Sequence, residues 1–84
     1  MNWVRELVDG RVRFFGVYRN SIQEPRLCYV THVPQLGKWV VTVKRRETDR
    51  KPLFIATVNS DREGKTFCEE LAAGRTAHVQ EVHT

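Results

Sequence analysis

Two cysteines and three histidines are the residues of this chain best suited to metal binding or nucleophilic catalysis. Cys28 and His32 lie in a β-rich segment, where a strand would hold them about 13 Å apart, too far to share a metal ion. His78 and His83 have no obvious third ligand. Cys68 falls on the apolar face of a predicted helix, and no base can be identified for Cys28. We therefore expect no metal site, no cofactor and no catalytic residue, and both cysteines are interpreted as small core residues.

The tripeptide Gly64-Lys65-Thr66 follows a predicted strand and opens a predicted helix, where a phosphate-binding loop would lie. The nucleotide-binding pattern needs a first glycine five residues earlier, so that the backbone can turn around the phosphates. Asn59 occupies that position. We therefore expect no nucleotide loop, and we interpret Gly64 as the point where the helix approaches a sheet closely.

Basic residues are concentrated in the middle of the chain. The 84 residues include 14 Lys and Arg against 10 Asp and Glu, which gives a net charge of +4. Residues 38–51 hold six basic and two acidic residues, residues 1–37 hold five and three, and residues 52–84 hold three and five. Such a cluster either attracts phosphate and other polyanions or keeps an exposed hairpin from aggregating.

Length and composition indicate a single domain over residues 1–84. Hydrophobic residues make up 40% and charged residues 29%, as in globular rather than disordered chains. No apolar run approaches the roughly 18 residues of a membrane span, and the start lacks the apolar core of a secretory signal. We therefore expect a cytoplasmic protein without membrane contact. A thin core leaves little room for a catalytic cleft, so a binding module is favoured over an enzyme.

Alternating apolar and polar residues predict a mostly β chain. Asp9-Gly10 predicts a hairpin with a type I′ turn, or the end of a short helix from Trp3 to Val8 capped by Asn2; the hairpin is favoured. The remaining strands are predicted over residues 11–19, 27–33, 38–46 and 53–58, with a possible edge strand over residues 77–82.

A helix is predicted to begin at Ser60. Ser60 and Glu63 have the spacing of a capping box, in which each side chain accepts a hydrogen bond from the other residue's backbone N–H. Gly74 is the predicted stop. The fold class is therefore α+β, a small antiparallel sheet of about four or five strands with one C-terminal helix across one face. The most buried side chains are expected to be Trp39, Val41, Val43, Phe54, Phe67 and Leu71.

Residues 26–74 resemble the three-strand-plus-helix DNA-binding domain of plant ethylene-response factors and the arm-site domains of phage integrases. Residues 37–43 (GKWVVTV) are similar to that family's glycine-lysine-aromatic second strand, residues 54–58 (FIATV) to its third strand, and residues 60–73 to its packing helix. The resemblance implies a sheet that enters the major groove. Its implied contacts are Lys38, Thr42, Lys44 and Arg46 from the outer face, with Arg50 and Lys51 near phosphates.

These observations predict a small basic accessory protein of a phage or other mobile element that binds DNA, or RNA, through phosphates. The phosphates are expected to contact a basic row of Lys38, Lys44 and Arg46 on the sheet face away from the helix. The alternative row is Arg11, Arg13 and Arg19. The second hypothesis is a protein-binding module, such as a phage-encoded inhibitor of a host or defence complex. Its basic patch would meet an acidic partner, or an exposed strand would extend the partner's sheet.

Overall fold

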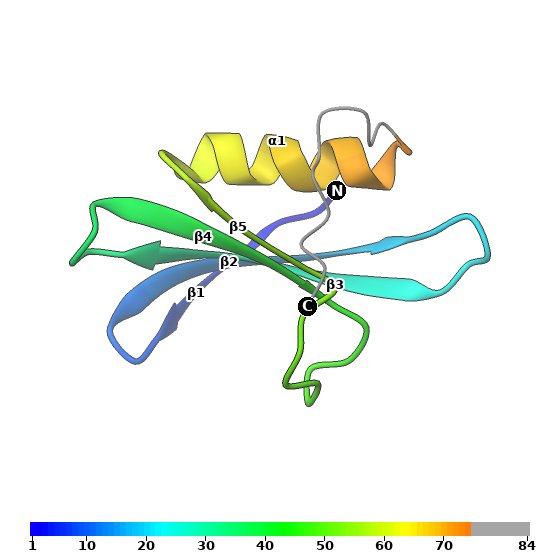
Figure 1. Cartoon of the computed structure of the whole chain (residues 1–84), viewed down its shortest axis with the longest axis horizontal. Helices are drawn as coiled ribbons and strands as arrows, with labels where there is room; N and C mark the ends of the chain where they lie inside the picture. Colours follow the sequence, from blue (N-terminus) through cyan, green and yellow to red (C-terminus); the bar gives the residue numbers. More distant parts are fainter. Residues whose placement is uncertain (75–84) are drawn as a thin grey trace.

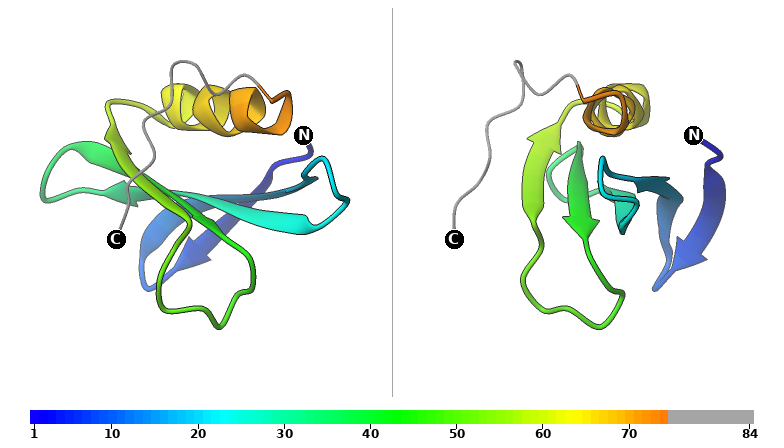
Figure 2. Two further views of the ribbon diagram at one scale, coloured as in Figure 1. Left: turned by 45° about the vertical axis from the view of Figure 1, so that its right-hand side comes forward. Right: turned by 90° about the vertical axis from the view of Figure 1, so that its right-hand side faces the viewer.

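The computed structural model describes residues 1–74, which form a five-stranded antiparallel sheet and one helix (Figure 1). The elements are β1 (Val4–Val8), β2 (Arg11–Arg19), β3 (Pro25–Val33), β4 (Lys38–Lys44), β5 (Phe54–Val58) and α1 (Asp61–Ala72). Strand order in the sheet follows the chain, β1-β2-β3-β4-β5. The helix covers one face, which confirms the predicted α+β class (Figure 2). The predicted edge strand over residues 77–82 lies outside the described residues.

The first hairpin forms as predicted around Asp9-Gly10. Both residues have positive φ, 52° and 76°, as a type I′ turn requires. Val8 pairs with Arg11 across this turn, so the alternative of a short N-terminal helix is wrong. The turn's right-handed twist matches that of the paired strands, which explains why a two-residue connection is enough.

The fourth strand is two residues shorter than predicted, since β4 ends at Lys44. Beyond it, the backbone N–H of Asp49 donates to the carbonyl of Arg46 at 3.1 Å, which closes a turn and takes the chain away from the sheet. The connection to β5 therefore spans residues 45–53. In Figure 2 it projects away from the helix, on the same side as the β1–β2 turn.

The core lies between the helix and the middle strands. Cys28 and Val30 of β3 are fully buried, and they contact a cluster completed by residues of β4, β5 and α1. The other buried members are Val41, Val43, Val58, Cys68 and Leu71. Small and β-branched side chains at the centre let the helix approach the sheet closely, and a Cβ on Gly64 would meet a methyl group of Val30 at 2.7 Å.

The prediction of the most buried side chains was half wrong. Val41, Val43 and Leu71 are buried, but Trp39, Phe54 and Phe67 are only half-buried. Because the helix sits so close to the sheet, no large ring fits beneath it. The rings pack around the rim of the contact instead, and Phe54 and Phe67 meet edge to face at 6.3 Å.

The helix begins after Ser60, but only half of the predicted capping box forms. The Ser60 hydroxyl accepts from the Glu63 N–H at 3.1 Å. The Glu63 carboxylate accepts from the N–H of Asn59, at 3.2 Å, rather than from that of Ser60. Gly74, with φ 75°, follows the helix as predicted and donates to the carbonyl of Leu71.

Candidate nucleic-acid interface

The sheet has an open face, the one that α1 does not cover. Residues directly opposite each other in an antiparallel pair share a face. Tyr29 and Thr31 alternate with the buried Cys28 and Val30, so they belong to the open face. The strand register extends this face to β2 and β4, because Arg13 of β2 lies opposite Thr31 and Thr42 of β4 lies opposite Tyr29.

Charge is divided between the two layers of the molecule. Among the strand residues on the open face, five are basic and only Glu6 is acidic. The five are Arg11, Arg13, Arg19, Lys38 and Lys44. The helix carries two basic residues, Arg62 and Lys65, against four acidic ones. The open face is therefore the basic surface of the molecule.

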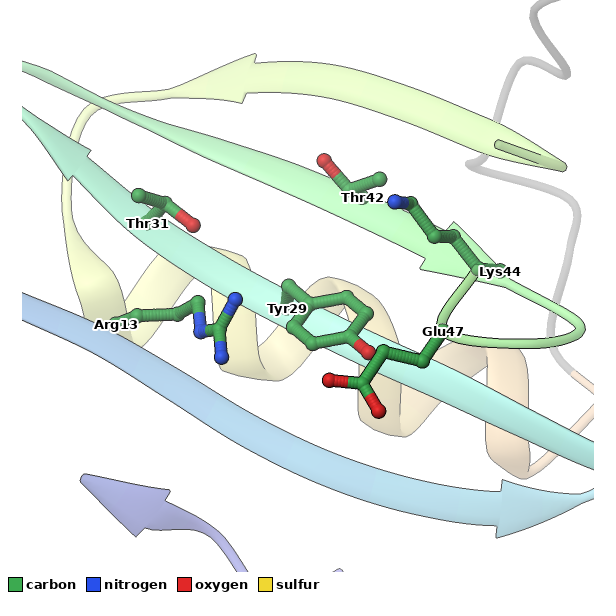
Figure 3. Close-up of a pocket in the computed structure, with 6 residues that line it drawn as sticks. All are labelled: Arg13, Tyr29, Thr31, Thr42, Lys44 and Glu47. Atoms are coloured by element: carbon green, nitrogen blue, oxygen red, sulfur yellow. The ribbon is translucent and has the colours of Figure 1, made fainter. Parts of the chain in front are cut away.

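A hollow of about 210 Å³ lies in the middle of this face, and its lining comes from β2, β3, β4 and the start of the following loop (Figure 3). The lining residues are Arg13, Tyr29, Thr31, Thr42, Lys44 and Glu47. We call it the basic hollow, because two cations and two threonine hydroxyls line it together with a single carboxylate.

Tyr29 forms the floor between the two cations. The Arg13 guanidinium carbon lies 4.8 Å from the ring centroid, and the Lys44 Nζ lies 5.9 Å from it. The ring is covered to the point that Tyr29 is only 7% exposed. Burial, and next the negative charge of Glu47, raise the pKa of the Tyr29 hydroxyl above its usual value. The phenol therefore stays neutral near pH 7 and can donate a hydrogen bond.

Arg13 is held in place by an ion pair. Its Nη2 bonds to the Glu6 carboxylate at 3.0 Å, and both side chains are about one-third exposed or less. Its Nε is enclosed by the protein and has no hydrogen-bond partner among the described residues, which is costly for a buried donor.

A second hollow, of about 260 Å³, continues from the first and shares Arg13, Tyr29 and Glu47 with it. The residues that line only this second hollow are Glu6, Phe15 and Leu27. We call it the acidic hollow. It has two carboxylates, one guanidinium and two apolar side chains, with the Phe15 ring 5.2 Å from that of Tyr29.

The structure brings together two of the six contact residues that the sequence predicted. Thr42 and Lys44 both line the basic hollow. Lys38 lies on the same face, as predicted, and its ammonium donates to the Asn59 side chain at the end of β5. The predicted row of Lys38, Lys44 and Arg46 stops at Lys44, because β4 ends there.

The other three predicted contact residues lie in the loop over residues 45–53. The Arg46 side chain is 79% exposed, and its Nε lies 3.5 Å from the Asp49 carboxylate. Arg50 and Lys51 are exposed. Because β4 ends at Lys44, the alternation of side chains along the strand does not determine which way these three residues point. None of the three lines either hollow, and Arg46 lies instead in a separate hollow with Arg45 and the start of β3.

Sequence reasoning missed half of the site. The sequence points to Arg13 only within the alternative row, and it singles out none of Tyr29, Thr31 and Glu47 as a contact residue. The alternation of Tyr29 and Thr31 with Cys28 and Val30 was a usable signal, because it separates the two faces of β3. Which residues of β2 and β4 join them depends on register.

The two cysteines are buried and free, and they meet in the core between β3 and α1. A hydrogen bond with Cys28, and then burial, raise the pKa of the Cys68 thiol far above its usual value. Neither thiol is placed to act as a surface nucleophile. Residues 1–74 contain no group of three or more His, Cys, Asp or Glu side chains arranged to hold a metal ion.

No helix within the described part of the chain is long and apolar enough to cross a membrane. No family model matches this chain, and no curated protein or solved structure is significantly similar to it.

Proposed function

We propose that this protein is a small nucleic-acid-binding accessory protein, acting on DNA, whose open sheet face contacts phosphates. The observation that supports this most is the division of charge, with a basic open face backed by an acidic helix. A polyanion approaching such a molecule is attracted to one side and repelled from the other, which orients the encounter before any contact forms.

The arrangement of donors also favours phosphate. Arg13 and Lys44 lie on either side of Tyr29, and threonine hydroxyls from β3 and β4 adjoin them. Arginine, lysine and hydroxyl side chains are the usual partners of phosphate oxygens. The loop over residues 45–53 adds further exposed basic residues.

The first prediction tests this proposal through salt dependence. Replacing Lys44 and Arg46 by Ala should weaken binding to all sequences. It should also flatten the slope of log affinity against log salt by about 1.8 units on duplex DNA or 1.4 on a single strand. The measurement is fluorescence anisotropy with labelled duplex and single-stranded DNA from low to moderate salt.

The matched control removes the same charge from elsewhere, by replacing Arg5 and Arg62 with Ala. Both residues are exposed, and neither lies on the open face. The control should keep the wild-type slope. An equal flattening in both variants would place the contacts outside the open face. No binding by the wild type even at low salt would exclude nucleic acid.

A protein partner is the second candidate, and the edge strand β1 favours it. β1 pairs only with β2 among the described residues, so one side of its backbone is unpaired. Val4 is 55% and Leu7 71% exposed on this strand. An exposed apolar edge can accept a strand from another chain. Loss of partner binding on replacing Leu7 by Lys, without nucleic-acid binding by the wild type, would support this candidate instead.

A further inference from the structure

The two hollows of the open face are contiguous, but their chemistry differs. The basic hollow has two cations, two threonine hydroxyls and one carboxylate. The acidic hollow has one cation, two carboxylates and the apolar side chains of Phe15 and Leu27. A ligand that fills both must therefore be anionic at one end, and apolar with hydrogen-bond donors at the other.

The basic hollow suits a phosphate group. Lys44 forms no ion pair within residues 1–74, and the Arg13 side chain is 26% exposed beside its bond to Glu6. Figure 3 shows the Lys44 ammonium next to Thr42, with Thr31 and the Arg13 guanidinium on the other side of the hollow. Charged and hydroxyl side chains from three strands thus line one small space, and charged donors bind anions more strongly than neutral ones do.

The acidic hollow suits a phosphate less well than the basic hollow, because it adds Glu6 to Glu47 and lacks Lys44. It does suit a nucleobase. Phe15 and Leu27 offer an apolar surface for the ring, and a carboxylate accepts hydrogen bonds from base amino groups. Glu47 makes no ion pair within the described residues, so its two oxygens are open to such donors.

The two hollows adjoin, because they share Arg13, Tyr29 and Glu47, and their volumes are about 210 and 260 Å³. We propose that the open face binds one nucleotide of a single strand, with its phosphate in the basic hollow and an amino-bearing base, guanine above all, in the acidic hollow. Guanine presents two neighbouring N–H donors, which match the two oxygens of Glu47.

The inference rests on the proposed function and narrows it to single strands. A base inside a duplex is stacked, and its pairing donors are already used, so it cannot enter the acidic hollow. Tyr29 does not provide the stacking surface, because Arg13 and Lys44 cover its ring. The carboxylates of the acidic hollow select the base instead, and the cations of the basic hollow bind the phosphate.

The test compares single strands of about ten deoxythymidines with the same strands carrying one central deoxyguanosine, and with the corresponding duplexes. The wild type should bind the guanosine-containing single strand about tenfold more tightly than the all-thymidine strand, and more tightly than the duplex. Glu47→Gln removes one acceptor charge and should bring the two single strands to within about twofold. Glu70→Gln, the same change on the helix, should leave the preference intact.

The outcomes separate this inference from the proposal on which it rests. Salt-dependent binding with no preference for guanosine, or with a preference that Glu47→Gln leaves unchanged, would overturn the base site while nucleic-acid binding stands. Tighter binding to the duplex would overturn the single-strand inference alone. No binding to any of these DNAs would remove both.

Discussion

At the scale of single residues, small side chains determine how closely the two layers pack. Gly64 places the helix backbone against Val30 and Val41, and the neighbouring contact is made by two cysteines rather than by larger residues. The same closeness displaces Trp39 and Phe54 to the rim. Stability therefore depends on residues whose main property is that they occupy little space.

Replacing Gly64 by Ala should destabilise the protein, although alanine favours helix. The added Cβ would lie 2.7 Å from one methyl group of Val30 and 3.2 Å from one of Val41. Overpacking costs about 1–3 kcal/mol, against about 1 kcal/mol gained in helix propensity. Urea unfolding should show a net loss. Thr66→Ala, on the exposed side of the helix, is the control and should be neutral or slightly stabilising; a more stable Gly64→Ala variant would contradict this packing.

Stability should also fall in alkaline solution because of Cys68. Its hydrogen bond with Cys28, and its burial, raise the pKa of the thiol above the usual 9.0, whereas the thiol of the unfolded chain ionises near that pH. The stabilisation is therefore complete below about pH 9 and is lost as the pH rises above it, by up to about 1.4 kcal/mol per pH unit. Urea unfolding between about pH 8 and pH 10 measures this slope.

Cys68→Ala is the matching control for the alkaline effect. It should be less stable than the wild type at pH 8, because a buried side chain is truncated, but it should lose less stability between pH 8 and pH 10. The pH range of the experiment stops near pH 10 because the pKa values of Tyr18 and Tyr29 are also raised, chiefly by burial. Above pH 10 these two tyrosines add a similar loss of stability with rising pH. Equal slopes in wild type and variant would contradict the assignment to Cys68.

At the scale of elements, local signals decide where each strand and the helix begin and end. Asp9-Gly10 supplies the positive φ angles of the first turn. The second loop is organised by Asn20, whose side-chain oxygen accepts from the N–H groups of Ile22 and Glu24 at 3.1 and 2.8 Å. Ser60 satisfies one of the free N–H groups at the start of the helix.

Ser60→Ala should lower the free energy of unfolding by about 0.5–2 kcal/mol, because the Glu63 N–H loses its acceptor. The Glu63 carboxylate would remain bonded to the Asn59 N–H, so the helix should shorten at its start rather than melt. Thermal or urea unfolding measures the loss. Ser21→Ala in the exposed loop is the control, and an unchanged midpoint and slope in Ser60→Ala would contradict the cap.

At the scale of the whole molecule, the two layers differ in both role and charge. The acidic helix completes the core, and the basic sheet face remains open with a hollow at its centre. The loop over residues 45–53 contributes Glu47 to that hollow and carries further exposed basic residues. One face therefore serves stability, and the other is free for binding.

Nuclear magnetic resonance can locate the bound ligand on the whole molecule. On titration with a guanosine-containing single strand, the largest amide shifts should fall on the open-face residues Arg13, Tyr29, Thr31 and Lys44. Those of α1 should change little, because the helix lies on the far side of the sheet. Shifts concentrated in β1 around Leu7 would instead indicate that the edge strand is the binding surface.

The sequence by itself determined the features that depend on neighbours along the chain. Alternation predicted the strands, Asp9-Gly10 the first turn, and Ser60 the start of the helix, because period and backbone torsion are local properties. The cluster of cations over residues 38–51 likewise pointed to a basic surface.

Only the tertiary structure decided which residues meet across strands. The β2–β3–β4 register sets Arg13 opposite Thr31 and Tyr29 opposite Thr42, and so builds the hollow; a slip of one residue would move every side chain to the other face. The turn of Lys38 toward Asn59 and the displacement of Trp39 to the rim follow from contacts between residues far apart in the sequence. Such contacts depend on how the elements pack, and the spacing of residues along one strand does not encode them.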